Sequence, residues 1–135
     1  MNYFLAKTEP STYSIDTLER ERKTTWDGVT NAQAVKTIRA MKPGDRVFIY
    51  HSGGQAAVVG LATVVSDSRD APGNTRSAVV DLEFVTRLEP PVTLSEIKES
   101  KLFEDWSLVR QSRLSTMPAP DSFVAWMQQR YPGML

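Results

Sequence analysis

Runs of apolar, β-branched and aromatic residues predict several short strands in this chain. Two of these runs flank Ser52-Gly53-Gly54-Gln55, a combination typical of a β-hairpin. In a third run Val80, Leu82 and Phe84 alternate with acidic residues, which predicts a strand with one buried face. The predicted strands cover residues 3–7, 46–51, 57–66, 78–85 and 113–116.

Short helices are predicted where a residue that can cap a helix N-terminus precedes apolar residues at helical spacing. Thr93 is followed by Glu96, which is the spacing of a capping box. In the last helix Phe123, Trp126 and Met127 share one stripe, so we expect Trp126 in the core. The capping residues are Ser14, Asn31, Thr93 and Asp121, and the helices extend to about residues 22, 41, 100 and 131.

Two segments show neither pattern. Thr25 to Thr30 is turn-like because it contains Asp27-Gly28, and Asp67 to Arg76 has the composition of an exposed loop. Strands joined by hairpins and interleaved with short helices are typical of a strongly curved antiparallel sheet or a small barrel. The sequence therefore predicts an α+β fold.

The composition describes one small domain with few reactive side chains. A chain of 135 residues suffices for a single domain over residues 1–135. With no Cys and one His, the chain excludes disulfide scaffolds, cysteine nucleophiles and Cys-based or His-rich metal sites, and we expect no metal and no other cofactor. Residues 1–20 lack a leader pattern, and the longest apolar run, residues 56–65, is well short of the ~20 residues that span a membrane. We therefore expect a cytoplasmic protein without a membrane partner.

Positive and negative charges balance over the whole chain but not locally. Sixteen Lys and Arg residues match sixteen Asp and Glu residues, whereas a protein that coats nucleic acid by charge alone is strongly basic. Basic residues nevertheless gather at Lys36, Arg39, Lys42 and Arg46, with only Asp45 among them. Lys36 and Arg39 are candidates for phosphate contacts, the alternative being a solvated basic face of a helix. Any contact with nucleic acid must therefore be local.

Few combinations of residues support catalysis. His51 and Ser52 are adjacent, and neighbouring residues of a strand point to opposite faces, so a dyad would need a bulge there. Glu9 and Asp27 could act as a paired acid and base, although capping or turn hydrogen bonds are the simpler explanation for carboxylates in separate loops. No Gly-rich segment has the ending of a phosphate-binding loop.

Two residues are stronger candidates for ligand contacts. Trp26 lies between Thr25 and Asp27 rather than on an apolar stripe, so it either plugs the end of a barrel or offers a stacking surface to a flat ligand. Asn31 caps a helix, and the free N–H groups in front of it suit an anionic or acceptor-rich ligand. Both interpretations stay open for each residue.

Taken in order along nearly the whole chain, several blocks resemble the EVE domain family. The family pattern has Arg and Tyr where this chain has Thr30 and Ala32, and the segment Asp67 to Arg76 is shorter than in relatives. The blocks that carry the resemblance are Tyr3-Phe4-Leu5-Ala6-Lys7-Thr8-Glu9-Pro10-Ser11, Trp26-Asp27-Gly28-Val29-Thr30-Asn31-Ala32-Gln33-Ala34, Phe48-Ile49-Tyr50-His51-Ser52 and residues 108–118.

The resemblance implies a PUA-like curved antiparallel pseudobarrel of about five to six strands with short surrounding helices, similar to the YTH and SRA readers of modified bases. It also implies non-enzymatic binding of a modified nucleobase in DNA or RNA, with the base flipped into an aromatic and polar pocket. Trp26 would stack on the base and Asn31 would bind its edge, while Lys36 and Arg39 would contact the phosphate backbone. The other implied site residues are His51, Ser52, Arg113, Ser115, Lys7 and Thr8.

Two further functions remain as alternatives. One is the binding of a small free metabolite in a closed pocket. The other is an enzyme that acts on a modified base, with Glu9 or Asp27 as acid or base and His51 assisting. In each case we expect a monomer or a weak dimer.

Overall fold

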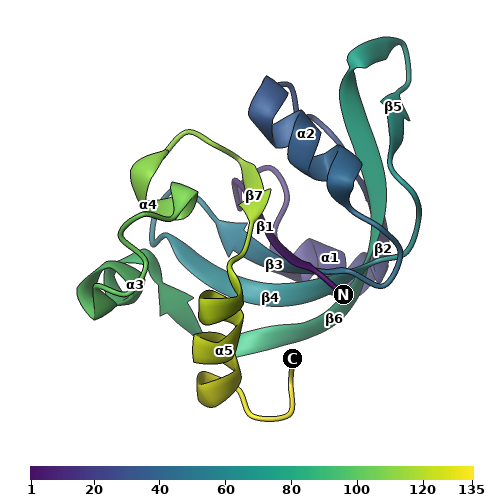
Figure 1. Ribbon diagram of the computed structural model, residues 1–135. Coiled ribbons are helices and arrows are strands. Elements are labelled where there is room, and N and C mark those ends of the chain that lie inside the picture. The colour runs from purple at the N-terminus through teal and green to yellow at the C-terminus, as the bar shows by residue number, and fades with distance from the viewer.

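The computed structural model describes residues 1–135 and contains a curved seven-stranded sheet with five short helices around it (Figure 1). The strands are β1 (Tyr3–Thr8), β2 (Lys23–Trp26), β3 (Arg46–His51), β4 (Ala57–Val64), β5 (Arg69–Ala71), β6 (Asn74–Thr93) and β7 (Thr116–Pro118). The helices are α1 (Ile15–Glu21), α2 (Ala32–Ala40), α3 (Leu94–Ser100), α4 (Ser107–Arg110) and α5 (Asp121–Arg130).

The sheet is mixed and open, which corrects the prediction of an antiparallel sheet of five to six strands. Its order is β2-β6-β4-β3-β1-β7, with β5 paired to β6. β1 and β3 run parallel, because α1, β2 and α2 form a crossover between them, and the other pairs are antiparallel. The sheet curves without closing, so β2 and β7 stand at its two ends. Helix α2 contacts both β6 and β7 and lies beside the hairpin of β5 and β6 in Figure 1.

The strands predicted at residues 3–7, 46–51 and 57–66 are confirmed as β1, β3 and β4, with the hairpin between the last two. Three other predictions were wrong in their bounds. Strand β6 extends far beyond residues 78–85, and the segment at residues 67–76 is a β-hairpin rather than a loop. The strand expected around residues 113–116 lies at β7 instead.

Trp26 was wrongly placed in a turn, since it is the last residue of β2. It pairs with Val80 on β6. Its predecessors Thr24 and Thr25 face partly or fully toward solvent, so β2 is a short edge strand with little apolar periodicity. The segment between β2 and α2 therefore begins at Asp27, two residues later than predicted.

Three of the four predicted helix caps are confirmed. The Ser14 side chain accepts a hydrogen bond from the Thr17 N–H at 3.3 Å, and the side chain of Thr93 forms the predicted capping box. Asn31 Oδ1 accepts from the Ala34 N–H at 3.0 Å. Asp121 is not a cap, because α5 begins after Pro120 and Asp121 occupies its first turn, where a carboxylate favours the helix dipole.

The core is one cluster of 35 buried residues in which aromatic rings join α5 to the sheet. Phe123 is fully buried, and its ring centroid lies 5.3 Å from Phe48 on β3 and 4.6 Å from Trp106. The Trp106 indole N–H donates to the Pro118 carbonyl at 2.9 Å, which fixes the segment before α4 against β7. Trp126 was expected in the core but is only half-buried, and it packs on the cluster from its rim. None of the five helices has the length and apolar character needed to cross a membrane.

Candidate functional site

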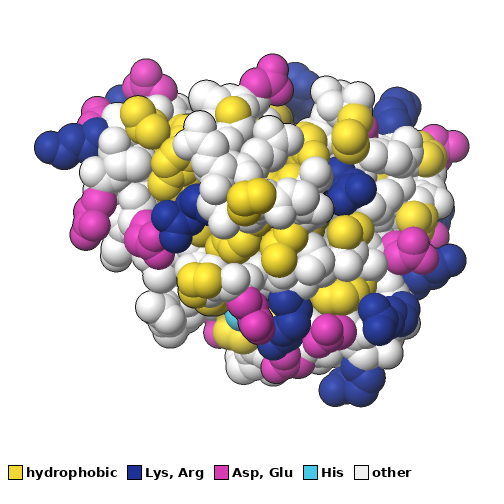
Figure 2. All heavy atoms as spheres, turned by 90° about the horizontal axis from the view of Figure 1, so that it is seen from below, with side chains coloured by type: hydrophobic (Ala, Val, Ile, Leu, Met, Phe, Trp, Pro, Cys, Tyr) yellow, Lys and Arg dark blue, Asp and Glu magenta, His cyan; other side chains and the backbone are white.

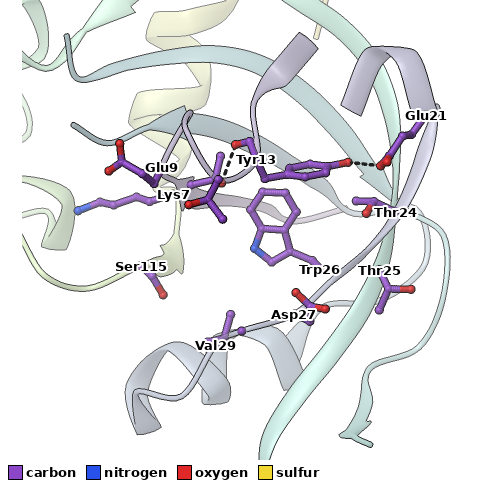
Figure 3. A pocket seen from close by; sticks show the side chains of 13 residues that line it. Lys7, Glu9, Tyr13, Glu21, Thr24, Thr25, Trp26, Asp27, Val29 and Ser115 are labelled. Atoms are coloured by element: carbon purple, nitrogen blue, oxygen red, sulfur yellow. Dashed lines mark hydrogen bonds between the residues drawn. The ribbon is translucent and has the colours of Figure 1, made fainter. Parts of the chain in front are cut away.

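A hollow of about 520 Å³ lies at the seam where the sheet fails to close (Figure 3). The end of β1 and the loop after it form one wall, β2 and the turn after it form another, and Ser115 enters from the segment before β7. We call this space the Trp26 hollow. Its lining residues are Lys7, Thr8, Glu9, Thr12, Tyr13, Glu21, Thr24, Thr25, Trp26, Asp27, Gly28, Val29 and Ser115.

Trp26 belongs to both the core and the hollow. Its side chain is only 7% exposed, and the ring of Tyr13 meets it edge-on at 90° with centroids 6.0 Å apart. The indole N–H of Trp26 has no hydrogen-bond partner within the chain. Every fully buried polar side-chain atom of the protein has a partner, so this N–H is open to the hollow. In Figure 3 this edge faces the space between Ser115, Val29 and Asp27. The alternatives of plug and ligand surface therefore do not exclude each other at this position.

Hydrogen bonds fix the position of Tyr13 at the rim of the Trp26 hollow. Its hydroxyl donates to Glu21 Oε1 at 2.7 Å, and the Thr8 hydroxyl donates to its carbonyl at 2.8 Å. Burial raises the pKa of Tyr13 above its usual value, so the phenol remains a neutral donor at physiological pH. Tyr13 lies two residues before α1 and Glu21 is the last residue of α1, so this helix sets the distance between them.

The charge around the Trp26 hollow is mostly negative. Glu9, Glu21 and Asp27 line it, and none of them forms an ion pair within the chain. Lys7 is the only cation in the lining, and its ammonium donates to the Ser112 carbonyl at 3.1 Å. Figure 3 shows this ammonium at the edge of the hollow, away from Trp26, and burial lowers the pKa of Lys7.

A second hollow of about 310 Å³ adjoins the first along two chain segments. Asn31 follows the turn that contributes Val29, and Arg113 lies two residues before Ser115. The second hollow, called here the Arg113 groove, is lined by Asn31, Arg110, Gln111, Ser112, Arg113 and Leu114. Its lining holds two cations and no carboxylate, but Arg110 pairs with Asp105 at 3.2 Å, so Arg113 is the unpaired cation of the groove.

Two residues that the resemblance implied, His51 and Ser52, line neither hollow. His51 Nε2 accepts a hydrogen bond from the Ile15 N–H at 3.0 Å and so secures the start of α1. Desolvation lowers the pKa of His51, while Asp16 raises it and Arg87 lowers it. Figure 2 shows only a small part of this side chain, between acidic and basic groups. The Ser52 N–H donates to the Thr8 carbonyl at 3.0 Å.

The two candidate phosphate ligands on α2 have different surroundings. Lys36 is exposed and forms no ion pair. Arg39 pairs with Asp70 at 2.9 Å and donates to the Thr75 carbonyl at 3.1 Å, which ties α2 to the hairpin of β5 and β6. Lys36 is therefore the freer of the two cations.

The structure thus separates the predicted residues into groups. The Trp26 hollow brings together four of them, Lys7, Thr8, Trp26 and Ser115. It also contains Glu9 and Asp27, the two carboxylates of the enzyme hypothesis. The Arg113 groove brings together Asn31 and Arg113. Sequence reasoning missed Thr12, Tyr13, Glu21, Thr24 and Thr25. A signal existed for the last two, because the run Thr24-Thr25-Trp26 has high β-propensity and could have indicated an edge strand.

Comparisons with known proteins agree with this architecture. The sequence profile of the EVE domain matches residues 2–130. Thymocyte nuclear protein 1 of Rattus norvegicus is 33% identical over 125 residues, which cover 72% of this chain and 55% of the relative. This chain therefore spans about half the length of that curated relative.

Two solved structures are similar in fold. A protein from Agrobacterium tumefaciens has a TM-score of 0.88 at 34% identity, with 97% of this chain and 94% of the other covered. The human THYN1 protein, solved in complex with 5-methylcytosine-containing DNA, has a TM-score of 0.85 at 24% identity, with 97% and 98% covered. The curved, open sheet with short helices is thus the PUA-like fold that the resemblance implied. On its sequence profile and its fold, the chain belongs to the EVE domain family.

Proposed function

We propose that this protein binds a modified nucleobase of DNA or RNA without chemically changing it. The base leaves its stack and enters the Trp26 hollow, and the backbone next to it lies along the Arg113 groove. The observation that carries the proposal is the free indole N–H of a nearly buried tryptophan, directed into a hollow that adjoins a basic groove. Support for the class of partner comes from human THYN1, which has been solved with 5-methylcytosine-containing DNA.

The volume of the Trp26 hollow and the groups that line it suit a base-sized ligand. Its volume of about 520 Å³ lies within the ~300–1,000 Å³ of typical small-ligand sites. A flipped base is read by stacking and by hydrogen bonds to its edge. Trp26 offers an aromatic surface and a donor, and the hydroxyls of Thr8 and Ser115 offer further hydrogen bonds.

The Arg113 groove supplies what the phosphate backbone needs. Arg113 forms no ion pair within the chain, and Lys36 on the neighbouring helix is likewise free. In this proposal Asn31 keeps its capping bond to Ala34, so the N-terminus of α2 stays ordered beside the backbone. His51 contributes indirectly, since its imidazole holds the start of α1 rather than the ligand.

A tryptophan substitution tests the proposal. Trp26→Phe keeps most of the buried ring but removes the N–H, and Trp26→Ala removes the aromatic surface as well. Loss of a stacking partner should weaken binding of a 5-methylcytosine oligonucleotide and of other modified oligonucleotides by ~1–3 kcal/mol, measured by fluorescence anisotropy. Trp126→Phe is the matched control, because Trp126 lies on the rim of the core and outside the hollow.

Circular dichroism must show a native fold for each variant. Unchanged affinity in a folded Trp26→Phe and a folded Trp26→Ala would contradict the placement of the base. Mass spectrometry of the oligonucleotide after incubation separates binding from catalysis. A product that disappears in Glu9→Gln or Asp27→Asn would establish the enzyme hypothesis instead.

A further inference from the structure

We propose that Lys7 binds the phosphate group of the flipped nucleotide itself, at the junction between the Trp26 hollow and the Arg113 groove. This inference rests on the proposed function and adds a second point of recognition to it. The ligand is then a nucleotide rather than a free base or a nucleoside, since neither of these carries the phosphate that Lys7 would bind.

Lys7 lies where the two hollows meet. It lines the Trp26 hollow, and its backbone N–H donates at 2.8 Å to the carbonyl of Ser115, which lines the same hollow. Its ammonium donates at 3.1 Å to the carbonyl of Ser112, which lines the Arg113 groove. Figure 3 shows the ammonium at the edge of the hollow, pointing away from Trp26. A nucleotide whose base lies against Trp26 would place its sugar and phosphate toward such an edge.

The ammonium of Lys7 has no anion beside it. Lys7 is the only lysine of the chain that is half-buried rather than exposed, and it forms no ion pair. The carboxylate of Glu9, two residues further on, lies against Gly53 in the turn between β3 and β4 instead. Burial lowers the pKa of Lys7, because desolvation disfavours the charged form. A phosphate at this position would supply the missing anion.

The same ammonium keeps donors for a ligand and is held in place. An ammonium has three N–H donors, and the Ser112 carbonyl takes one of them, which leaves the others free. The ring of buried Tyr50, with its centroid 5.6 Å from Lys7 Nζ, attracts the charge from another side. The ring and the carbonyl together restrain a side chain that is flexible when exposed, so less entropy is lost when a phosphate binds.

Single uncharged linkages in a strand test this contact. A methylphosphonate carries a methyl group in place of one phosphate oxygen and has no charge. Single-stranded oligonucleotides with one 5-methylcytosine are compared by fluorescence anisotropy when they carry no methylphosphonate, one on the 5′ side of the modified base, one on its 3′ side, or one at the end of the strand. For the unaltered protein, one of the two flanking linkages should cost about tenfold in affinity, as expected for a hydrogen bond to a charged group. The linkage at the end should cost less than about twofold.

Variants at residue 7 assign the loss to its side chain. Lys7→Gln keeps N–H donors but has no charge, so the sensitive methylphosphonate should now cost less than about twofold, which is the non-additivity of two groups in contact. Lys7→Arg keeps the charge and should keep the tenfold sensitivity. The matched control is Lys98→Gln, which makes the same change in net charge at an exposed lysine outside both hollows and should behave like the unaltered protein. Circular dichroism must show a native fold for each variant.

The outcomes separate this inference from the proposed function. If Lys7→Gln weakens every strand by the same factor and leaves the methylphosphonate effect in place, Lys7 only holds the Ser112 segment against β1, and the inference is wrong. Flanking methylphosphonates that cost no affinity would overturn it as well. In both cases a retained preference for 5-methylcytosine over cytosine leaves the proposed function standing, because Lys7 does not contact the base. Equal binding of modified and unmodified strands would overturn both.

Discussion

Replacing Gly60 by alanine is expected to destabilise the protein, because this glycine lets α1 approach the sheet. Gly60 lies on β4, and a methyl group added there would be 2.3 Å from Ile15 Cδ1 and 3.3 Å from the Thr86 carbonyl oxygen. Carbon atoms pack at about 3.5–4.0 Å, so the added group overlaps Ile15 by more than an ångström. Ile15 is 4% exposed and begins α1, which leaves it little room to move.

Overpacking of this kind costs about 1–3 kcal/mol, a large share of the ~5–15 kcal/mol that stabilises a typical domain. Urea denaturation followed by circular dichroism measures the free energy of unfolding. Ile15→Val removes the Cδ1 atom and by itself should cost about 0.5–1.5 kcal/mol. If the overlap with Ile15 is the cause, the double variant should be at least 1 kcal/mol more stable than the sum of the single changes predicts. Additive effects, or no effect of Gly60→Ala, would refute this reasoning.

Three other predictions concern a titration, a cap and the groove. Burial lowers the pKa of His51 below its usual 6.5. The contribution of neutral His51 to the free energy of unfolding is therefore complete above pH 6.5 and should be lost as the pH drops through the folded-state pKa. His51→Gln, which keeps an acceptor for the Ile15 N–H, should flatten the dependence of the free energy of unfolding on pH in this range. Thr93→Ala breaks the capping box of α3 and should cost about 1 kcal/mol in thermal or urea denaturation, with Ser at residue 93 restoring stability. Replacing Lys36 and Arg113 together by glutamine should weaken binding to all sequences alike and reduce the slope of log affinity against log salt by about 1.4–1.8, and an unchanged slope would place the backbone elsewhere.

Local chemistry was readable from the sequence, whereas long-range pairing was not. Ser14, Asn31 and Thr93 each accept from the N–H group three residues further on, so short segments contain all the information for these caps. The pairing of β1 with β3 joins residues more than forty positions apart, and no local pattern distinguishes a parallel from an antiparallel partner there. The fold therefore became predictable through the family resemblance more than through periodicity.

Strand β6 shows how tertiary context overrides a local signal. Pro90 and Pro91 are typical of a strand end, yet they lie within this strand. On the neighbouring β4, Val58 pairs with Val92 and Gly60 with Arg87, so the prolines fall in a bulge where no ladder hydrogen bond is required. The hairpin before it has a related cause, because Pro72-Gly73 is typical of a loop but forms a tight turn between β5 and β6 here.

The candidate site was predictable residue by residue but not as a grouping. Trp26 stood out because a large aromatic side chain lay among polar neighbours, and it does line the hollow. His51 also stood out as the only histidine. Its partner Ile15 is 36 residues away, and no residue next to His51 in the sequence indicates that contact. Glu21 belongs to the charged run at residues 19–23, which is typical of a solvated helical face, and only its contact with Tyr13 places it in the wall.

The seam that holds the Trp26 hollow also bears on the order in which the protein folds. The Lys7 N–H donates to the Ser115 carbonyl at 2.8 Å, so the wall joins residues near both ends of the chain. Closing a loop of that length costs roughly 4 kcal/mol of chain entropy, which must be offset by contacts formed elsewhere first. A chain still emerging from the ribosome can build α1, β3 and β4 early, but it gains the complete hollow only after β7 docks on β1. In the proposed function, ligand binding therefore follows the last steps of folding, and partly synthesised chains should not compete for the ligand.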